Sequence, residues 1–494
     1  MNGIRTRLCC VARLSLMTRL CRARLCCVMI GAALLLTACK KGPDFVPPAP
    51  PAPVTFRTEL PAGESVANLS WWDLYEDPAL QDLIRTGLEN NRNLREAMSR
   101  IAESRANLGM VRADLYPSVN VIAFGFFQET LRDDSVSAFD NVKIGLSASY
   151  EVDLWGRVAR SNEAALQGLL ATEEAFRTVT ITLVADIAGA YLVLRDLDAR
   201  LAIALSTLET RQVSVNLLAS RAEGGLVPAV DVARAEIEFA DTEATIQALT
   251  RARSQTENVL SLLVGRLPTD VTRGASLADQ TFPPAVPAGL PSELLQRRPD
   301  VLAAERRLHA QTAIIGVAEA ARFPSLSLTS AAGAKATSLG EVTDGNIFFN
   351  FGANILGPFF NAGRNKQRVE VERTRTEQLL NQYEQIVLNA FREVEDALVG
   401  VETYRLESEA RIRQVAAASG ALEVAEARYE GGLTSYMEVL DLQRSLFGSQ
   451  LQATEALQLH HSSIVQLYMA LGGGWSVEED AAGDAVAPAQ QDQP

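Results

Sequence analysis

The sequence predicts a mixed α+β membrane protein that contains an internal duplication of about 207 residues. Three observations lead to this prediction. Matched residues recur at one constant offset, helical segments of about 60 residues run without a helix breaker, and shorter segments alternate between apolar and polar side chains. The alternation is typical of membrane β-strands and the long helices of coiled coils, so we expect a β-barrel continued by a long α-helical coiled-coil barrel.

The duplication is visible as pairs of short matching stretches. Gly224-Gly225-Leu226 matches Gly431-Gly432-Leu433 at an offset of 207. The same offset relates Tyr116-Pro117-Ser118 to Phe323-Pro324-Ser325, Gly156-Arg157 to Gly363-Arg364, Gly109 to Gly316, and Gly265 to Gly472. This period is too long for a solenoid repeat. We therefore predict a first repeat over 70–267, an equatorial connector over 268–299 and a second repeat over 300–474, related by a pseudo-twofold axis.

The clearest predicted helix covers 161–220, which would be roughly 90 Å long at about 1.5 Å per residue. Steps of four and three residues from Phe176 give a heptad seam with one polar member. The same register in the second repeat begins at Tyr383 and weakens at Ser408 and Arg411. Shorter helices are predicted over 93–115, 229–264, 300–322 and 436–471. In each repeat the two shorter helices together match the long one, so we expect them to stack end to end along it; an ordinary helical bundle is the alternative.

Four membrane strands are predicted, two in each repeat. They begin at Ser118, Val142, Ser325 and Ile347, and the aromatic residues Trp155, Phe359 and Phe360 lie at strand ends, where a membrane protein places aromatic side chains. Four strands cannot close a barrel, and unpaired strand edges are not tolerated in lipid. We therefore predict a homotrimer with one 12-stranded barrel. On the polar face, Glu151 and Asp153 would add negative charge to the lumen and could favour cations.

The N-terminus carries a predicted signal peptide over 1–38, with six arginines before an apolar run that ends at Ala38. All six cysteines lie at or before Cys39, so the mature chain has no disulfide framework or thiolate metal site. Leu36-Thr37-Ala38-Cys39 resembles a bacterial lipobox, which implies cleavage before Cys39 and acyl chains on its sulfur and amine. In that class Lys40 implies sorting to the outer membrane. An ordinary signal peptide is the alternative, and translation could start at Met1 or Met17.

The two ends of the mature chain are predicted to lie outside the folded body. The lipidated N-terminus and Pro-rich tether, 39–69, favours an extended chain, and the acidic tail, 475–494, is predicted to be disordered.

Several longer stretches resemble the TolC-like outer membrane factors, in particular the lipoprotein branch that serves drug-efflux pumps. The matching stretches are "SWWDLYEDPALQDLI" (70–84), "RRPDVLAAERRL" (297–308), "FFNAGRNKQ" (359–367) and "YEGGLTSYMEVLDLQRSLF" (429–447). The resemblance implies a trimer with a short outer-membrane barrel and a long periplasmic helical barrel. It also implies a passive exit duct for small molecules that docks to a periplasmic adaptor protein and an inner-membrane pump, without a cofactor. The alternative within the family is a duct for peptide or protein secretion.

The predicted site lies at the two helix turns. Gly224, Gly225, Gly431 and Gly432 would end the long helices, with Asp231 and Glu438 favouring the helices that follow. Glu438 and Asp441 share a helix face, and by resemblance they match carboxylates that ring the closed pore. Three chains would bring six carboxylates together, which would raise at least one pKa or hold a cation. Tyr429 matches a latch residue, whereas the family's latch arginine aligns near Thr434.

Other functional classes are poorly supported by the sequence. The formal net charge of −14 disfavours binding to nucleic acid. The three histidines lack metal-ligand spacing, and no phosphate-binding loop or nucleophile elbow is present, so we expect neither a metal site nor an enzyme. A surface-anchored hydrolase and a monomeric coiled-coil adhesin are the rival interpretations, and the adhesin would leave the alternating strands unexplained.

Overall fold

The computed structural model describes most of the predicted mature chain. The described residues are 40–49, 55–57, 75–132, 135–280, 291–337 and 346–473, with backbone only at 126–141 and 291–293. The predicted signal peptide, Cys39, most of the tether and the acidic tail lie outside them. The chain divides into two compact units, and each sequence repeat contributes to both. The first unit takes in residues up to 48, 103–170 and 305–381, and the second takes in 49–102, 171–304 and the chain from 382 onward.

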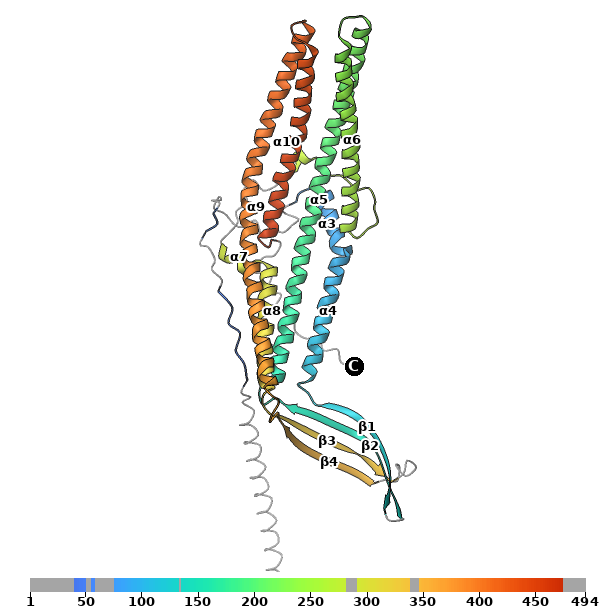
Figure 1. The fold of residues 1–494 in the computed structure, drawn as a ribbon, viewed down its shortest axis with the longest axis vertical. Helices are drawn as coiled ribbons and strands as arrows, with labels where there is room; N and C mark the ends of the chain where they lie inside the picture. Colours follow the sequence, from blue (N-terminus) through green and yellow to red (C-terminus); the bar gives the residue numbers. More distant parts are fainter. Residues whose placement is uncertain are drawn as a thin grey trace, which may run out of the picture. The chain divides into compact units, whose positions relative to one another are not determined.

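The helices repeat at the predicted offset (Figure 1). They are α3 Pro78–Asn90, α4 Arg92–Ala113, α5 Arg157–Glu223, α6 Ala229–Leu263, α7 Pro291–Arg297, α8 Pro299–Ala320, α9 Arg364–Glu430 and α10 Tyr436–Ala470, with a short 3₁₀ helix η2 at Leu277–Asp279. Helices α5 and α9 have 67 residues each and begin 207 residues apart. Each follows a glycine with positive φ, Gly156 or Gly363. Helix α5 begins at Arg157, before the predicted start at residue 161. The short helices α3 and α7 were not separately predicted.

The shorter helices meet end to end at two equivalent junctions within the second unit. The Asn91 side-chain amide donates to the carbonyl of Leu263, the last residue of α6, at 2.8 Å, and its oxygen caps the start of α4. In the second repeat, the Arg298 guanidinium donates to the carbonyl of Ala470, the last residue of α10, at 3.1 Å. The two junctions are equivalent, because Arg298 follows Asn91, and Ala470 follows Leu263, by 207 residues. The predicted end-to-end stacking is therefore confirmed where the helices join.

The predicted heptad seam forms the core of the second unit. Every seam position from Phe176 to Leu208 is buried or half-buried, and Ile187 and Leu194 are fully buried. The second-repeat seam is buried at Tyr383 and Ala397, and the polar Ser408 is also buried, whereas Arg411 and the seam positions after it are half-buried. Helix α5 also contains a window long and apolar enough to cross a membrane, but a buried core helix passes the same test. Its apolar residues lie in this core.

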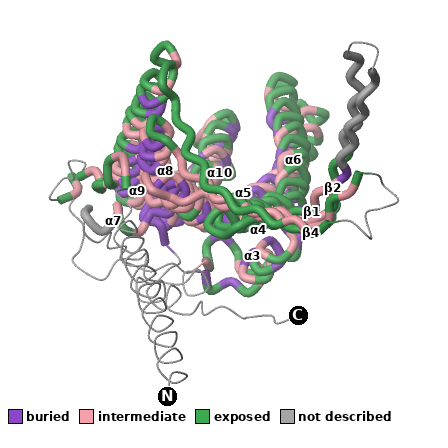
Figure 2. The backbone as a smooth tube through the Cα atoms, turned by 90° about the horizontal axis from the view of Figure 1, so that it is seen from below, coloured by how far each residue is buried: buried purple, intermediate pink, exposed green. Residues whose placement is uncertain are grey.

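The first unit contains one four-stranded antiparallel sheet, as predicted. The strands are β1 Ser118–Arg132, β2 Ser135–Val152, β3 Ser325–Ala336 and β4 Asn346–Leu356, in the order β1-β2-β3-β4. The described side chains of this sheet are mostly exposed or half-buried (Figure 2). Strands β1 and β4 are edges without a partner among the described strands. A sheet that exposes both its edges and its faces in one chain is suited to pairing with strands of other chains.

Candidate functional site: helix tips and sheet faces

The two predicted turns close the helical hairpins α5–α6 and α9–α10, which lie side by side in the second unit (Figure 1). At the end of α5, Gly225 has φ +70°, and the Leu226 N–H donates to the Arg221 carbonyl at 2.9 Å. At the end of α9, Gly432 has φ +71°, and Leu433 donates in the same way to Arg428 at 2.8 Å. These are Schellman motifs, in which glycine avoids the cost of a left-handed backbone. Only the second glycine of each pair has positive φ, so Gly224 and Gly431 are not required for that reason.

The predicted acidic residues lie where the sequence placed them. Asp231 is in the first turn of α6 and Glu438 in the first turn of α10. The Glu438 carboxylate accepts a hydrogen bond from the Thr434 hydroxyl and lies 3.3 Å from the Arg428 guanidinium. Asp441 lies 3.6 Å from Arg444. Both carboxylates therefore have an arginine of their own chain nearby, and a ring of them requires further chains.

Tyr429 has an arginine partner, although not the one expected from the family pattern. The Arg221 guanidinium donates to the Tyr429 hydroxyl at 2.7 Å and lies 5.3 Å from the ring centroid. The Tyr429 ring also packs edge-on against Tyr436. Thr434, near which the family's arginine aligns, bonds to Glu438 instead. Arg221 is the repeat equivalent of Arg428, so the 207-residue offset was the signal that could have found it.

A second cluster near the tips was missed by the sequence analysis. The Arg211 side chain is only 3% exposed, and it lies 3.1 Å from the Glu238 carboxylate and 2.6 Å from the Thr242 hydroxyl. The exposed Arg444 of α10 approaches the same carboxylate at 2.9 Å. This cluster joins α5, α6 and α10, so it ties the hairpin of one repeat to that of the other.

The sheet has one apolar and one polar face, as the alternation predicted. Directly opposed residues of antiparallel strands point to the same side, so the register defines both faces. The apolar face carries Val119, Val121, Ile144, Leu146, Leu326, Leu328, Ile347, Phe349, Phe351 and Ile355. The polar face carries Asn120, Lys143, Ser147, Ser149, Ser327, Thr329, Lys335, Asn350 and Asn354, with Ile122, Phe124 and Phe348 as apolar members. Because Ile347, Phe349 and Phe351 are each more than half exposed, the apolar face is uncovered in one chain.

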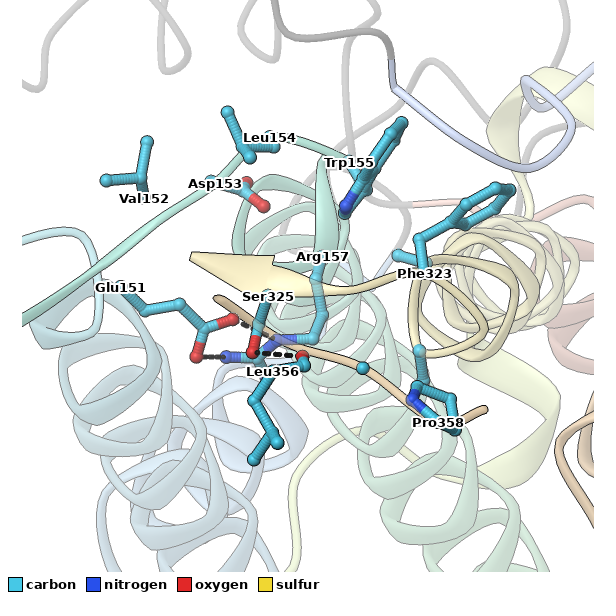
Figure 3. A pocket seen from close by; sticks show the side chains of 13 residues that line it. Glu151, Val152, Asp153, Leu154, Trp155, Arg157, Phe323, Ser325, Leu356 and Pro358 are labelled. Carbon is cyan, nitrogen blue, oxygen red and sulfur yellow. Dashed lines mark hydrogen bonds and ion pairs between the residues drawn. The ribbon is translucent and has the colours of Figure 1, made fainter. Parts of the chain in front are cut away.

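Glu151 and Asp153, which we expected to add negative charge to the lumen, both have partners within the chain (Figure 3). Arg157 binds Glu151 through two hydrogen bonds of 3.0 and 2.9 Å. Asp153 accepts a hydrogen bond from the Ala159 N–H, in the first turn of α5, at 2.8 Å. A carboxylate at this position is stabilised by the positive end of the helix dipole. Both residues border a cavity of about 480 Å³ at the junction of strands and helices.

Part of the predicted tether is bound to the first unit rather than free. The Lys41 N–H donates to the Trp155 carbonyl at 3.1 Å, and its ammonium lies 5.7 Å from the Trp155 ring centroid. Arg160, with a side chain 3% exposed, donates to Asp44 at 2.6 Å. Phe45 stacks on His309 at a centroid distance of 4.3 Å. The residues that follow Cys39 are therefore fixed beside the strand ends.

The described residues contain no group of three His, Asp or Glu side chains arranged to hold a metal ion. Phe359 and Phe360 are almost fully exposed beyond the end of β4. Their place in an aromatic girdle stays a prediction.

Comparison with known proteins gives a consistent result. Residues 83–266 and 290–473 each match the family model of the outer membrane efflux proteins. The chain is 36% identical over 453 residues to the cation efflux system protein CusC of Escherichia coli O157:H7, with 90% of this chain and 97% of CusC covered. It is 36% identical over 463 residues to the toluene efflux pump outer membrane protein TtgI of Pseudomonas putida, with 91% and 98% covered.

The fold is similar to that of solved channels. The open state of the MtrE outer membrane channel of Neisseria gonorrhoeae superposes with a TM-score of 0.82 at 32% identity, and the match covers 88% of this chain and 98% of MtrE. The fold class predicted from the sequence, with four strands per chain and long helices in a trimeric outer-membrane channel, is confirmed.

Proposed function

The chain belongs to the outer membrane efflux protein family and is an outer-membrane efflux duct, and on this premise we propose how its described surfaces assemble and operate. Three chains pair β4 of one with β1 of the next and close a 12-stranded barrel. The duct receives small molecules from an inner-membrane pump and a periplasmic adaptor protein and passes them outward without chemical change.

The observation that carries this proposal is the two-faced sheet with free edges. A single chain leaves its apolar face and the edges β1 and β4 uncovered; the apolar face would be unstable in water, and the unpaired edges would be unstable in lipid. Barrel closure satisfies the edges, and lipid covers the apolar face. The relatives reported above are named as efflux proteins, so no specific observation favours the secretion alternative.

We also propose that Cys39 is the lipid anchor. Its neighbour Lys40 lies against Gly156, where an added Cβ would come 3.0 Å from the Lys40 Cα. The contacts of Lys41 with Trp155 and of Asp44 with Arg160 hold the chain at the strand ends. A barrel strand ends at the membrane surface, so acyl chains on Cys39 would enter the lipid beside the barrel without further extension of the chain.

The experiment is native mass spectrometry of protein extracted from outer membranes, with Cys39→Ser as the matched control. We expect a trimer whose subunit begins at Cys39 and carries acyl chains, and an unlipidated Cys39→Ser protein. A monomer would contradict the barrel closure. An unlipidated trimer would keep the duct and remove the anchor.

The helix tips are the proposed gate, with Glu438 and Asp441 of the second repeat ringing the pore. Each carboxylate is about half exposed in one chain, with exposed fractions of 41% and 57%, so both are available to a central opening. The double variant Glu438→Ala/Asp441→Ala should change the single-channel conductance of the purified trimer. The variant Glu409→Ala, on the exposed surface of α9 and paired with Arg405, is the control. An unchanged conductance in the double variant would show that the gate lies elsewhere.

A further inference from the structure

The polar face of the sheet is the one that would line the lumen, because a membrane barrel turns its apolar face to lipid and its polar face inward. Gly145 and Gly333 are directly opposed on β2 and β3 and belong to this face. A Cβ added to Gly145 would collide with the Ala332 carbonyl, and one added to Gly333 would collide with the Ile144 carbonyl. Glycine in a strand marks close backbone approach or a bend at a barrel corner. The backbones of β2 and β3 therefore approach each other closely at this glycine pair, on the polar face.

Charged side chains are rare on this inner face. The described side chains of this face belong to Ser118–Phe124 of β1 and to the other three strands. The charged side chains among them are Glu151, Lys143 and Lys335. Glu151 is neutralised by the two hydrogen bonds from Arg157. The described residues place no carboxylate within ion-pair distance of either lysine. Among the described side chains of this sheet face, the charges without an opposite partner are therefore positive.

The two lysines lie directly opposite each other. Lys143 on β2 is the register partner of Lys335 on β3, although the strands are far apart in the sequence. The whole chain contains five lysines, which are Lys40, Lys41, Lys143, Lys335 and Lys366. Like charges at directly opposed positions destabilise a sheet. A neutral polar residue, such as the serines and asparagines on the rest of this face, would avoid that cost, so the pair requires another explanation.

The position of the pair within the barrel gives one. Lys143 precedes the end of β2 at Val152 by nine residues, and Lys335 follows the start of β3 at Ser325 by ten. At about 3.3 Å per residue, the pair lies roughly 30 Å along the strands from the ends that join the helices. It is therefore at the outer end of the four-stranded part of the wall, and β1 and β2 continue beyond it to Arg132 and Ser135.

We propose that Lys143 and Lys335 of the three subunits form a ring of six positive charges at the outer end of the lumen, which selects for anionic solutes. This inference rests on the proposed trimeric duct. The ring attracts solutes that bear carboxylate, phosphate or sulfonate groups and repels cations. At 0.1 M salt the Debye length is about 10 Å, so neighbouring charges of such a ring reinforce one another across a water-filled lumen.

The test is the reversal potential of the purified trimer in planar lipid bilayers under a KCl gradient, near 0.1 M. The variants are Lys143→Gln/Lys335→Gln, which removes the ring, and Lys143→Arg/Lys335→Arg, which keeps its charge. Lys366→Gln is the matched control, because it removes one exposed lysine at the start of α9, outside the sheet. We expect the chloride-to-potassium permeability ratio to fall by about threefold or more in the glutamine variant, since counter-ion focusing by a charged lumen reaches at least that size. The arginine and Lys366→Gln variants should behave as the unmodified protein.

A second measurement keeps the inference falsifiable if another constriction dominates the salt current. Inositol hexakisphosphate added on the outer side should block the unmodified channel reversibly and should block the glutamine variant at least about tenfold more weakly, because the ring's counter-ion binding is lost. Equal permeability ratios and equal block in the two proteins would overturn the inference and leave the duct intact. A monomer in native mass spectrometry would overturn the trimeric duct itself, and the ring with it.

Discussion

The cluster around Glu238 provides a sharp test of how the two hairpins are held together. The perturbation is Glu238→Ala, which removes the carboxylate that lies 3.1 Å from Arg211 and 2.9 Å from Arg444. Arg211 would keep its bond to Thr242 and its contact with the Phe447 ring, whose centroid is 5.2 Å away. Its guanidinium would remain buried without a counter-charge. Burial already lowers the pKa of Arg211, and Glu238 opposes that effect.

The expected cost follows from the contrast between the two arginines. Removing one partner of a buried ion pair costs about 3–5 kcal/mol, because the other charge remains desolvated. An exposed pair contributes about 0–1 kcal/mol, and the Arg444 side chain is 62% exposed. At about 2.1 cal/mol/K per residue, a chain of about 450 residues changes its Tm by about 1 °C per kcal/mol, so Glu238→Ala should lower Tm by roughly 3–5 °C. Arg444→Ala should lower it by no more than about 1 °C on the same basis.

The assay is thermal unfolding of the purified trimer, followed by far-UV circular dichroism at one protein concentration and one scan rate. Both conditions are fixed because oligomer dissociation and irreversible unfolding influence Tm. The double variant Arg211→Met/Glu238→Leu removes both charges and should recover most of the loss, since apolar replacements of buried pairs are neutral or stabilising. The reasoning is refuted if Glu238→Ala and Arg444→Ala have equal effects, or if the double variant is as unstable as Glu238→Ala.

Two further predictions concern single residues of the helices. His461 is 7% exposed and burial lowers its pKa to about 4, so the folded state binds fewer protons than the unfolded state between about pH 6.5 and 4. The free energy of unfolding should therefore decrease as the pH falls through this range, by at most about 3 kcal/mol, since each unit of pKa difference corresponds to about 1.4 kcal/mol. The decrease in Tm between pH 7 and pH 4.5 should be smaller in His461→Gln than in the unmodified protein. Gly432→Ala places a Cβ at φ +71° and should lower the free energy of unfolding by about 1–2 kcal/mol. Gly420→Ala is the control: it lies inside α9 with open space at its Cβ position, so it should be neutral or stabilising by up to about 1 kcal/mol. Equal Tm changes in these two glycine variants would contradict the Schellman assignment.

The long helices could be predicted because their signals are local or repeated. Heptad spacing identified the seam that contains Ile187 and Leu194, and the 207-residue offset located both turns. Strand alternation fixed which residues share a face, since the side-chain period of a strand is two. The break between α3 and α4 was missed because Asn91, which interrupts the helix, is not a strong helix breaker. Its role depends on its bond to Leu263, a residue 172 positions away.

The contacts at the tips depend on packing between the repeats. The Tyr429 partner, Arg221, is on the other long helix, and the sequence points to it only through the 207-residue offset from Arg428. The same holds for Arg211, which resembles any other helix-surface arginine until α6 and α10 are placed beside it. An arginine is usually exposed, so the sequence pattern alone would assign this side chain to solvent.

The lumen charge shows a more general limit of alternation as evidence. A period of two residues shows that Glu151 and Lys143 share a face, but it does not show which of them keeps its charge. Arg157 neutralises Glu151 from the first turn of α5, six residues later, whereas Lys143 meets a second lysine. The duplication does not predict that meeting, because the repeat equivalent of Lys143 is Asn350 on β4. Only the register between β2 and β3 brings Lys143 opposite Lys335. Charge selectivity of the barrel is therefore a property of strand register, and substitutions that preserve the alternation can reverse it without altering the fold.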